Sequence, residues 1–550
     1  MINQKTMKTK IFTITLLCGT LAMLSCSDFL TEDSKGRITS EKYFASQEDL
    51  DGAVNVLYSR VQRSINSAHT LAPNWMGDDI TALPGGNKNV FREFDTYMVN
   101  NNNADTKNAW NANYSIIKAA NFIINNVERV PVNEEEKNIG RGQALFWRSV
   151  AYFKLVRWFG SIPLVLNTDI DFNIGKTTIE AVYERICTDL EEAERILPTQ
   201  YNTAPRFDNL NNYVNKGAAQ AVLAAVYMAR AGYPLRQEQY YKQAAEMAKK
   251  VIDGVKNNDY YYKLEDTYKK RFNYVSNPYS LEGVVAVKFN KDNPWGWSGL
   301  DSQHSACQAY ESVTNGGWGD AVAEIKFWKE MPDGPRKDAI YGSNNGQIYV
   351  EKNTYMGKKI NWYLKTGDDF IVSEAHPMFR TLLYGGGKDG NTMSDYDDSS
   401  CMLNNGICSQ TLYMISYSEV LLWYAEAQAR SGTIPSDAVQ ALQQVLDRAY
   451  GKDKDDAQKY ADPTAFANKC LREHGYEVAG YYPALVARSN DQLRMDDLKN
   501  SFIQRQSNTP VEVEKGIFIA EGVQVTGAWS DERNYAAIPL FDSDLNDNLK

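Results

Sequence analysis

RGQALFWRSVAYFKLVRWFGSIPLV, at residues 141–165, is the stretch that decides the fold. Between positions 144 and 159 only four residues are polar: Arg148, Ser149, Lys154 and Arg157. On a helix Arg148 points to one side and Lys154 and Arg157 nearly to the other, so no continuous polar face remains. A helix that is apolar almost all round packs against neighbours on several sides, and this one is too short and too charged to span a bilayer. We therefore predict a buried helix with other helices on both flanks. Gly160 offers its C-terminal stop, and Pro163 forbids further helix.

Helical periodicity continues before and after this stretch. Apolar residues recur every three or four positions in four helix pairs, which we place at 47–130, 134–197, 215–252 and 416–450. The small and aromatic residues of the last two pairs follow the spacing of degenerate tetratricopeptide-like repeats. We therefore predict a mostly α fold in which the helix pairs stack into a scaffold that itself carries no chemistry.

Residues 261–410 have a different composition. They are rich in Gly, Asn, Asp and aromatic residues, and they contain one convincing strand, GVVAVKFN at 283–290. An insert of this length is too long for a connector. We expect a large irregular lobe with short strands, packed against the helix pairs and shaping a binding surface. This divides the chain after residue 25 into an N-terminal region at 26–260, the insert at 261–410 and a C-terminal region at 411–550.

The first 25 residues have the pattern of a secretory signal peptide. Lys8 and Lys10 precede the apolar run IFTITLLCGTLAML, and the polar sequence SDFLTEDS follows Cys26. Leu24-Ser25-Cys26 is typical of a bacterial lipobox, in which the cysteine becomes the lipid-modified first residue of the mature protein. Several acyl chains on Cys26 would anchor the protein firmly to a membrane.

Composition and motif spacing argue against several function classes. The 550 residues carry a net charge of −10 without a basic stripe, which disfavours nucleic acid because phosphate neutralisation drives that binding. The four histidines are isolated in sequence and no C-x-x-C occurs, so we expect no metal site and no cofactor. Cys401 and Cys408 are close enough in sequence to form a disulfide outside the cytoplasm. We do not expect an enzyme.

Tryptophans in polar, glycine-rich loops are the best candidates for ligand binding. Indole rings stack on the apolar faces of sugars while neighbouring amides and acids bind the hydroxyls. The alternative is that these rings fix the loops onto the helices. The candidates lie in three loops: Trp75 with Asp78, Trp295 with Trp297, and Trp318 with Asp320.

The pattern of the 141–165 stretch resembles the SusD/RagB family: R-x-x-A-x-x-(aromatic/R)-x-x-A-Y-F-x-L-V-R-x-(F/Y)-G-x-(I/V)-P-L. Other family-like segments follow in the family's order, namely the lipobox with SDFL, WNANYSIIKAANFIINNV at 110–127, ISYSEVLLWYAEA at 415–427 and AAIPL at 536–540. Together they span nearly the whole chain.

The resemblance implies a lipid-anchored protein on the surface of the outer membrane. Such proteins bind oligosaccharides or polysaccharides on a shallow aromatic arc and deliver them to a TonB-dependent porin, for which they act as a lid. Three alternatives remain open: a peptide-binding importer of the same family, a helical-repeat interaction scaffold, and a surface glycosidase.

Overall fold

The structure is a computed structural model, and it describes residues 43–168, 171–201, 213–273, 277, 280–289, 307, 318–341, 348–350, 358–366, 369–370, 376–382 and 410–550. Several predictions lie outside the described residues: the signal peptide, the anchor Cys26, Trp295, Trp297, and the pair Cys401 and Cys408.

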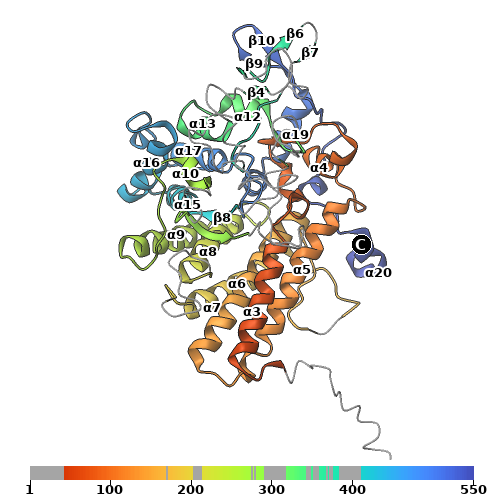
Figure 1. Ribbon diagram of the computed structural model, residues 1–550, viewed down its shortest axis with the longest axis vertical. Helices are drawn as coiled ribbons and strands as arrows, with labels where there is room; N and C mark the ends of the chain where they lie inside the picture. The colour runs from red at the N-terminus through yellow and green to blue at the C-terminus, as the bar shows by residue number, and fades with distance from the viewer. Residues whose placement is uncertain are drawn as a thin grey trace, which may run out of the picture.

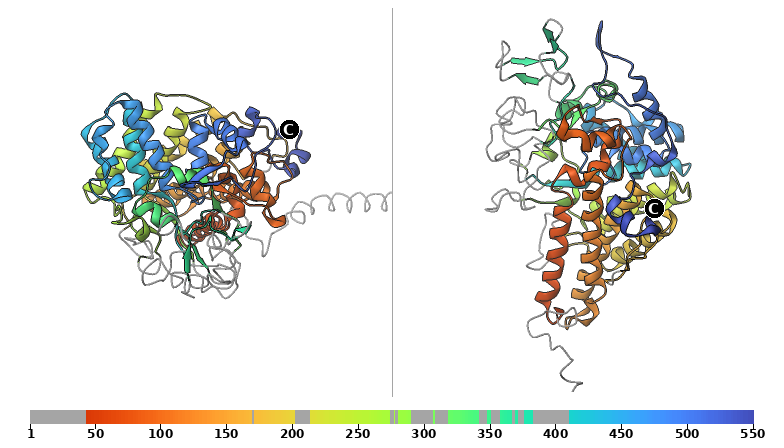
Figure 2. Two further views of the ribbon diagram at one scale, coloured as in Figure 1. Left: turned by 90° about the horizontal axis from the view of Figure 1, so that it is seen from above. Right: turned by 90° about the vertical axis from the view of Figure 1, so that its right-hand side faces the viewer.

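The four predicted helix pairs are confirmed. They are α3 (Gln47–Arg63) with α5 (Ala104–Ile124), α6 (Glu134–Phe159) with α7 (Ile179–Ile196), α8 (Lys216–Ala231) with α9 (Tyr240–Lys256), and α15 (Tyr417–Arg430) with α16 (Ser436–Tyr450). In each pair the two helices pack together, and neighbouring pairs also pack on each other. The long helices α3 and α5 stand side by side in Figure 1 and again in the right-hand view of Figure 2.

Helix α6 is the buried helix that the 141–165 stretch predicts. Asn133 caps its first turn by accepting a hydrogen bond from the Glu136 amide at 2.9 Å, and Gly160 ends it with a φ of 71°. Every side chain from residue 143 to residue 159 is buried. Helices α5 and α7 pack against α6, so the predicted neighbours on both flanks are present.

Shorter helices complete the described part of the chain. They are α4 (Asn89–Asp95), α10 (Tyr268–Phe272), α12 (Ile325–Glu330), α13 (Pro335–Tyr341), α17 (Pro463–Glu477), α18 (Arg488–Arg494), α19 (Leu498–Ser507) and α20 (Leu540–Leu545). Helix α17 packs against α15 and was not among the predicted helices.

The described strands are short and pair in twos, always antiparallel. The pairs are β1 (Ile80–Thr81) with β3 (Val322–Ala323), β2 (Gly283–Val287) with β8 (Leu412–Ser416), β4 (Ile348–Val350) with β5 (Lys358–Ile360), β6 (Lys365–Thr366) with β7 (Asp369–Phe370), and β9 (Val511–Glu514) with β10 (Ile517–Ile519). The predicted strand at 283–290 is thus confirmed as β2. Since β8 leads directly into α15, the β2–β8 pair fastens both ends of the irregular lobe to the helix pairs.

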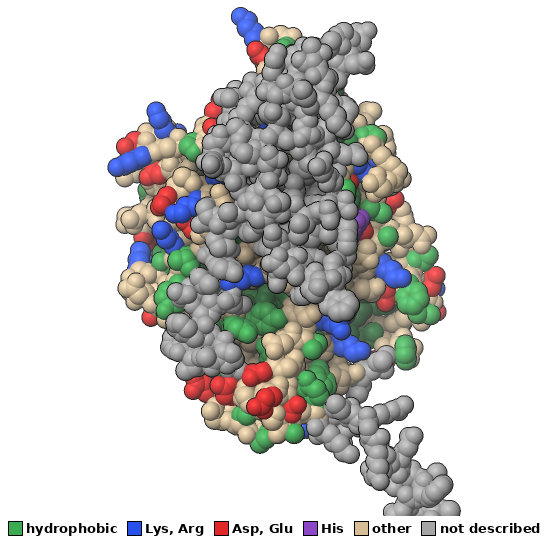
Figure 3. All heavy atoms as spheres, viewed as in Figure 1, with side chains coloured by type: hydrophobic (Ala, Val, Ile, Leu, Met, Phe, Trp, Pro, Cys, Tyr) green, Lys and Arg blue, Asp and Glu red, His purple; other side chains and the backbone are tan. Residues whose placement is uncertain are grey.

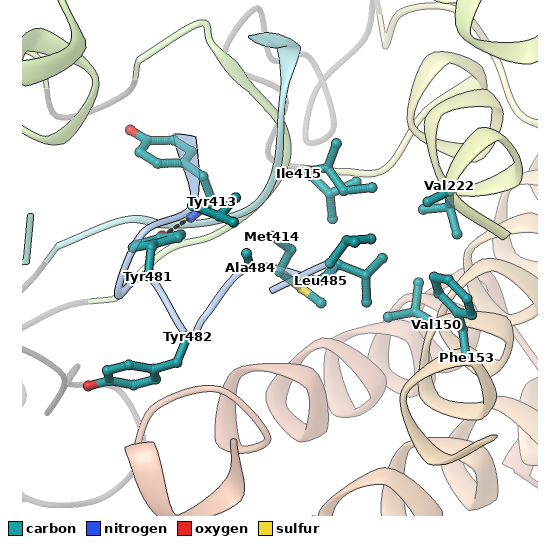
Figure 4. Packing of buried hydrophobic residues seen from close by; sticks show 14 of the residues in the cluster. Val150, Phe153, Val222, Tyr413, Met414, Ile415, Tyr481, Tyr482, Ala484 and Leu485 are labelled. Carbon is teal, nitrogen blue, oxygen red and sulfur yellow. Dashed lines mark hydrogen bonds between the residues drawn. The ribbon is translucent and has the colours of Figure 1, made fainter. Parts of the chain in front are cut away.

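The segment 481–485 joins the lobe to the helical core. Its Tyr481 hydroxyl accepts a hydrogen bond from the Tyr413 amide of β8 at 2.8 Å, and the Leu485 amide donates to the Met414 carbonyl at 2.7 Å. Figure 4 shows Leu485 near side chains of β8, α6 and α8, whereas the Tyr482 ring points away from this cluster. Tyr482 instead packs on Trp75, within the same hydrophobic core.

Candidate functional site

The β1–β3 pair brings together two of the three predicted tryptophan loops. Ile80 is in register with Ala323 and Thr81 with Val322, so the loop before β1 and the loop before β3 become neighbours. The Lys88 ammonium donates to the Gly319 carbonyl at 2.6 Å and joins the two segments again. The loop of Trp295 and Trp297 lies outside the described residues.

The structure places Trp75 in the core. Its side chain lies in the short 3-10 helix η2 (Ala72–Met76) and is 0% exposed. Its ring stacks on Phe91 of α4, with centroids 4.3 Å apart and an interplanar angle of 17°, and it also contacts Tyr482 at 5.3 Å. A sugar platform needs an open ring face, so this placement contradicts the prediction that Trp75 stacks directly on a ligand.

Asp78 connects its loop to α18. Its carboxylate accepts two hydrogen bonds from the Arg488 guanidinium, at 2.7 and 3.1 Å, which is the strong bidentate geometry. Asp78 also lines a pocket together with Glu324, Phe327 and residues of α19, and neither Trp318 nor Asp320 lines that pocket. The carboxylate of Asp78 is therefore already held by Arg488.

Asp320 lies beneath the surface, with 4% of the residue exposed. Burial raises the pKa of its carboxyl group, and the charge of Lys88 partly offsets that effect. Trp318, two residues earlier, is half-buried and packs against the hydrophobic core with part of its surface outside. Of the described candidates, Trp318 is therefore the tryptophan with accessible surface.

His69 was not predicted as a site residue. It lies close enough to Asp320 for the two charges to interact. It belongs to the 3-10 helix η1 (Ala68–Thr70), and 43% of its side chain is exposed. Its ring stacks on the outer side of Phe91, with centroids 4.9 Å apart and an interplanar angle of 24°. An isolated histidine in a polar loop has no sequence signal for such a role, because the ring beneath it comes from another element.

Asp105 fixes the orientation of the His69 ring. Both of its carboxylate oxygens lie within hydrogen-bond distance of His69 Nδ1, at 3.0 and 2.9 Å, and the carboxylate is buried in the first turn of α5. Burial opposes a charged ring, but the hydrogen bond to Asp105 and its negative charge outweigh burial and raise the pKa of His69.

We call the surface around His69, Lys88 and Trp318, with Phe91 and Asp320 buried beneath it, the His69 face. The charges on it are close enough to influence one another, since the pKa of Asp320 responds to both Lys88 and His69. Aromatic rings beside polar and charged groups suit a ligand that has an apolar face and many hydroxyl groups.

The described residues offer no sign of a metal centre or of a membrane span. No group of three or more His, Cys, Asp or Glu side chains among them is arranged to hold a metal ion. Within the same ranges, no helix combines the length and the apolarity that crossing a bilayer requires.

Comparisons with known proteins agree with this architecture. Residues 28–228 match a family model described as starch-binding and associating with the outer membrane. SusD-like protein P2 of Formosa agariphila is 26% identical over 456 residues, which are 80% of this chain and 82% of that protein. The crystal structure of a SusD homolog from Bacteroides thetaiotaomicron has a TM-score of 0.74 at 21% identity and covers 93% of this chain and 97% of its own. The chain is similar to SusD-like proteins over most of its length and has their fold.

One solved SusD-like protein is described as laminarin-binding. It shares the fold with a TM-score of 0.67 at 17% identity, covering 92% of this chain and 98% of its own. That protein and this chain therefore share one fold.

Proposed function

We propose that this SusD-like protein is a surface lipoprotein that captures an oligosaccharide or polysaccharide at the His69 face. Cys26 would carry the lipid anchor, since it follows an apolar run and the lipobox Leu24-Ser25-Cys26. The captured glycan would pass to a TonB-dependent transporter in the outer membrane, as the resemblance to the family implies.

The His69 face is the observation that carries the binding proposal. It joins a half-exposed imidazole and a half-buried indole with an ammonium group and a carboxyl group. A pyranose presents C–H groups on one face and hydroxyls at its rim, which matches rings beside hydrogen-bonding groups. A shallow site of this kind gives modest affinity, which suits a protein that must release its ligand again.

The carboxylates at this face support binding without turnover. A glycosidase needs two carboxyl groups that flank the scissile bond, one of them free to donate a proton. Asp105 is buried and holds His69, and Asp320 is buried beneath the face. Neither is placed to flank a bond of a ligand that lies on the outer side of His69.

Calorimetric titration of the full mature chain with laminarin and xyloglucan oligosaccharides, followed by a wider glycan array, tests this function. We expect binding without release of shorter products, and we expect Trp318→Ala to weaken it about five-fold or more, the effect of losing about 1 kcal/mol of aromatic contact. Phe518→Ala is the matched control, because this phenylalanine is 60% exposed on β10 and not part of the face. Absence of binding to every glycan, or release of shorter sugars, would overturn the proposal.

A further inference from the structure

Three rings from three separate elements form one stack beneath the His69 face. Trp75 of η2 is fully buried, Phe91 of α4 lies on it at 4.3 Å, and His69 of η1 lies on Phe91 at 4.9 Å. The interplanar angles of 17° and 24° make the two contacts stacked ones. Tyr482 also contacts Trp75, at 5.3 Å and a tilt of 46°. The stack thus runs from the core to the surface and ends in an exposed ring.

The outermost ring is held on one face and on one edge. Phe91 covers the inner face of His69, and the buried carboxylate of Asp105 holds Nδ1 at 2.9–3.0 Å. Asp105 in turn sits in a capped helix start, since the Asn103 side chain accepts hydrogen bonds from the amides of residues 105 and 106 at 2.8 and 3.1 Å. A ring fixed in this way loses little conformational freedom when a ligand arrives.

The loop that carries Trp75 is fastened at several points. Asn74 accepts a hydrogen bond from the Trp158 indole of α6 at 2.9 Å, and its amide donates to the Tyr482 carbonyl at 2.8 Å. Asp79 accepts from the Gly480 amide at 2.6 Å. The lower end of the stack is therefore tied both to the central helix and to the segment 480–484.

We propose that the outer face of the His69 ring is the platform on which a pyranose ring of the captured glycan stacks, and that Phe91 and Trp75 are positioning residues that hold this platform. This inference rests on the proposed function and assigns its contact surface. The Trp75 indole then affects glycan binding without touching the glycan. The ligand class is a sugar that presents an apolar C–H face, with hydroxyls able to reach Lys88 at the margin of the face.

Substitutions at residue 69 separate the ring from its hydrogen bond. His69→Gln keeps an N–H group for Asp105 but has no ring, and His69→Phe keeps a ring without that group. In titrations with the same laminarin and xyloglucan oligosaccharides and array-selected glycans, we expect His69→Gln to weaken binding about five-fold or more. We expect His69→Phe to retain most of it. Unchanged affinity in His69→Gln, with the parent chain still binding, would overturn the platform and leave the proposed function intact.

Substitutions at residue 75 test the positioning role. We expect Trp75→Leu to weaken binding by the folded protein several-fold, and Trp75→Phe, which can still stack on Phe91, to restore most of it. Trp147→Leu is the control for general destabilisation, because Trp147 is equally buried but lies on α6 and contacts Tyr58 and Phe146 instead. Equal loss of affinity in Trp75→Leu and Trp147→Leu would contradict a specific role of the stack. If the parent chain binds no glycan at all, the proposed function fails and the platform fails with it.

Discussion

Lys154 is a cationic residue in the middle of the most buried helix. Only 3% of the residue is exposed, and its ammonium lies 5.9 Å from the centre of the Trp158 ring. Burial, together with the nearby charge of Arg157, lowers its pKa to about 7 from a usual value of 10.5. Folding therefore disfavours the charged form of this side chain.

The pH dependence of stability follows from this shift. Between about pH 7 and pH 10.5 the unfolded chain binds a proton at Lys154 that the folded chain does not, so the contribution of this residue to the free energy of unfolding rises with pH. Below pH 7 both states are protonated and the full cost of the buried charge remains. We expect Lys154→Met to stabilise the protein by roughly 2–5 kcal/mol at pH 6 and by much less near pH 10.

Urea denaturation of the parent and of Lys154→Met at the two pH values measures this difference. Comparing the variants at each pH cancels the titration of other groups. A stabilisation of the same size at pH 6 and pH 10 would show that Lys154 is not the titrating residue.

Trp75 and His69 show why single residues of the site could not be assigned from sequence. The local sequence around Trp75, with its Gly, Asn and Asp residues, predicts an exposed ring. The rings that bury it, Phe91 and Tyr482, come from other elements and pack on it only in the folded chain. The position of His69 likewise depends on residues of other elements, because its ring stacks on Phe91 and is hydrogen-bonded to Asp105. The sequence pointed to the loops of Trp75 and Trp318, but not to which of their rings stays exposed.

At the scale of elements, α6 ties its neighbours together through a buried ion pair. Arg148 donates to both oxygens of Asp189 on α7, at 2.7 and 2.9 Å, and to the side chain of Asn121 on α5 at 2.8 Å. One guanidinium thus fixes the positions of three helices, and all its partners are buried. The apolar residues between these polar contacts supply the packing.

Truncation of an apolar side chain on α6 tests this packing. Leu155 is 0% exposed, so Leu155→Ala leaves a cavity, and we expect a loss of about 2–5 kcal/mol in the free energy of unfolding. Val56→Ala on α3 is the control, because Val56 is 49% exposed and its truncation should cost well under 1 kcal/mol. Chemical denaturation of both variants gives the comparison. A Leu155→Ala variant as stable as Val56→Ala would contradict the buried position of the helix.

Helix α17 is an element that the periodicity of apolar residues did not predict. Its first half buries Phe466, Ala467 and Cys470, but its second half buries the charged or polar residues Glu473, His474 and Glu477. These side chains pair with buried partners from elsewhere in the chain: Glu473 and Glu477 with Arg336, and His474 with Asp491. Charged residues over half of the inner face shorten the hydrophobic stripe, so apolar periodicity alone did not predict this helix.

At the scale of the whole molecule, the His69 face and the start of α3 lie far apart. Helix α3 begins at the lower end in Figure 1, beside the start of α6, where Gln47 donates to Glu136 at 3.3 Å. Residue 69 follows the other end of α3, which has 17 residues and is therefore about 25 Å long. A tether from Cys26 to residue 43 would hold the lower end toward the membrane, so the glycan face would point outward.

The charge at the lower end of the molecule affects how this end interacts with a membrane surface. Figure 3 shows acidic side chains gathered near the lower end of this view. The first turn of α6, at this end, carries Glu134, Glu135 and Glu136. A surface of this sign is repelled by anionic headgroups, whereas peripheral membrane binding through charge uses clusters of Lys and Arg. The described part of the chain also has no helix able to span a bilayer. This surface would not assist attachment, which we propose depends on a lipid at Cys26.

Substitution of the proposed lipid-bearing residue tests this dependence. Without Cys26 the chain keeps its fold but loses its acyl chains, so we expect Cys26→Ala to move the protein almost entirely from the membrane fraction to the soluble fraction. Cys187→Ala is the matched control, because this buried cysteine of α7 lies far from the tether in sequence and should leave the protein in the membrane fraction. Detergent phase partitioning and fractionation of cells measure the distribution. Membrane retention of Cys26→Ala equal to that of Cys187→Ala would mean that another part of the chain holds the protein at the membrane.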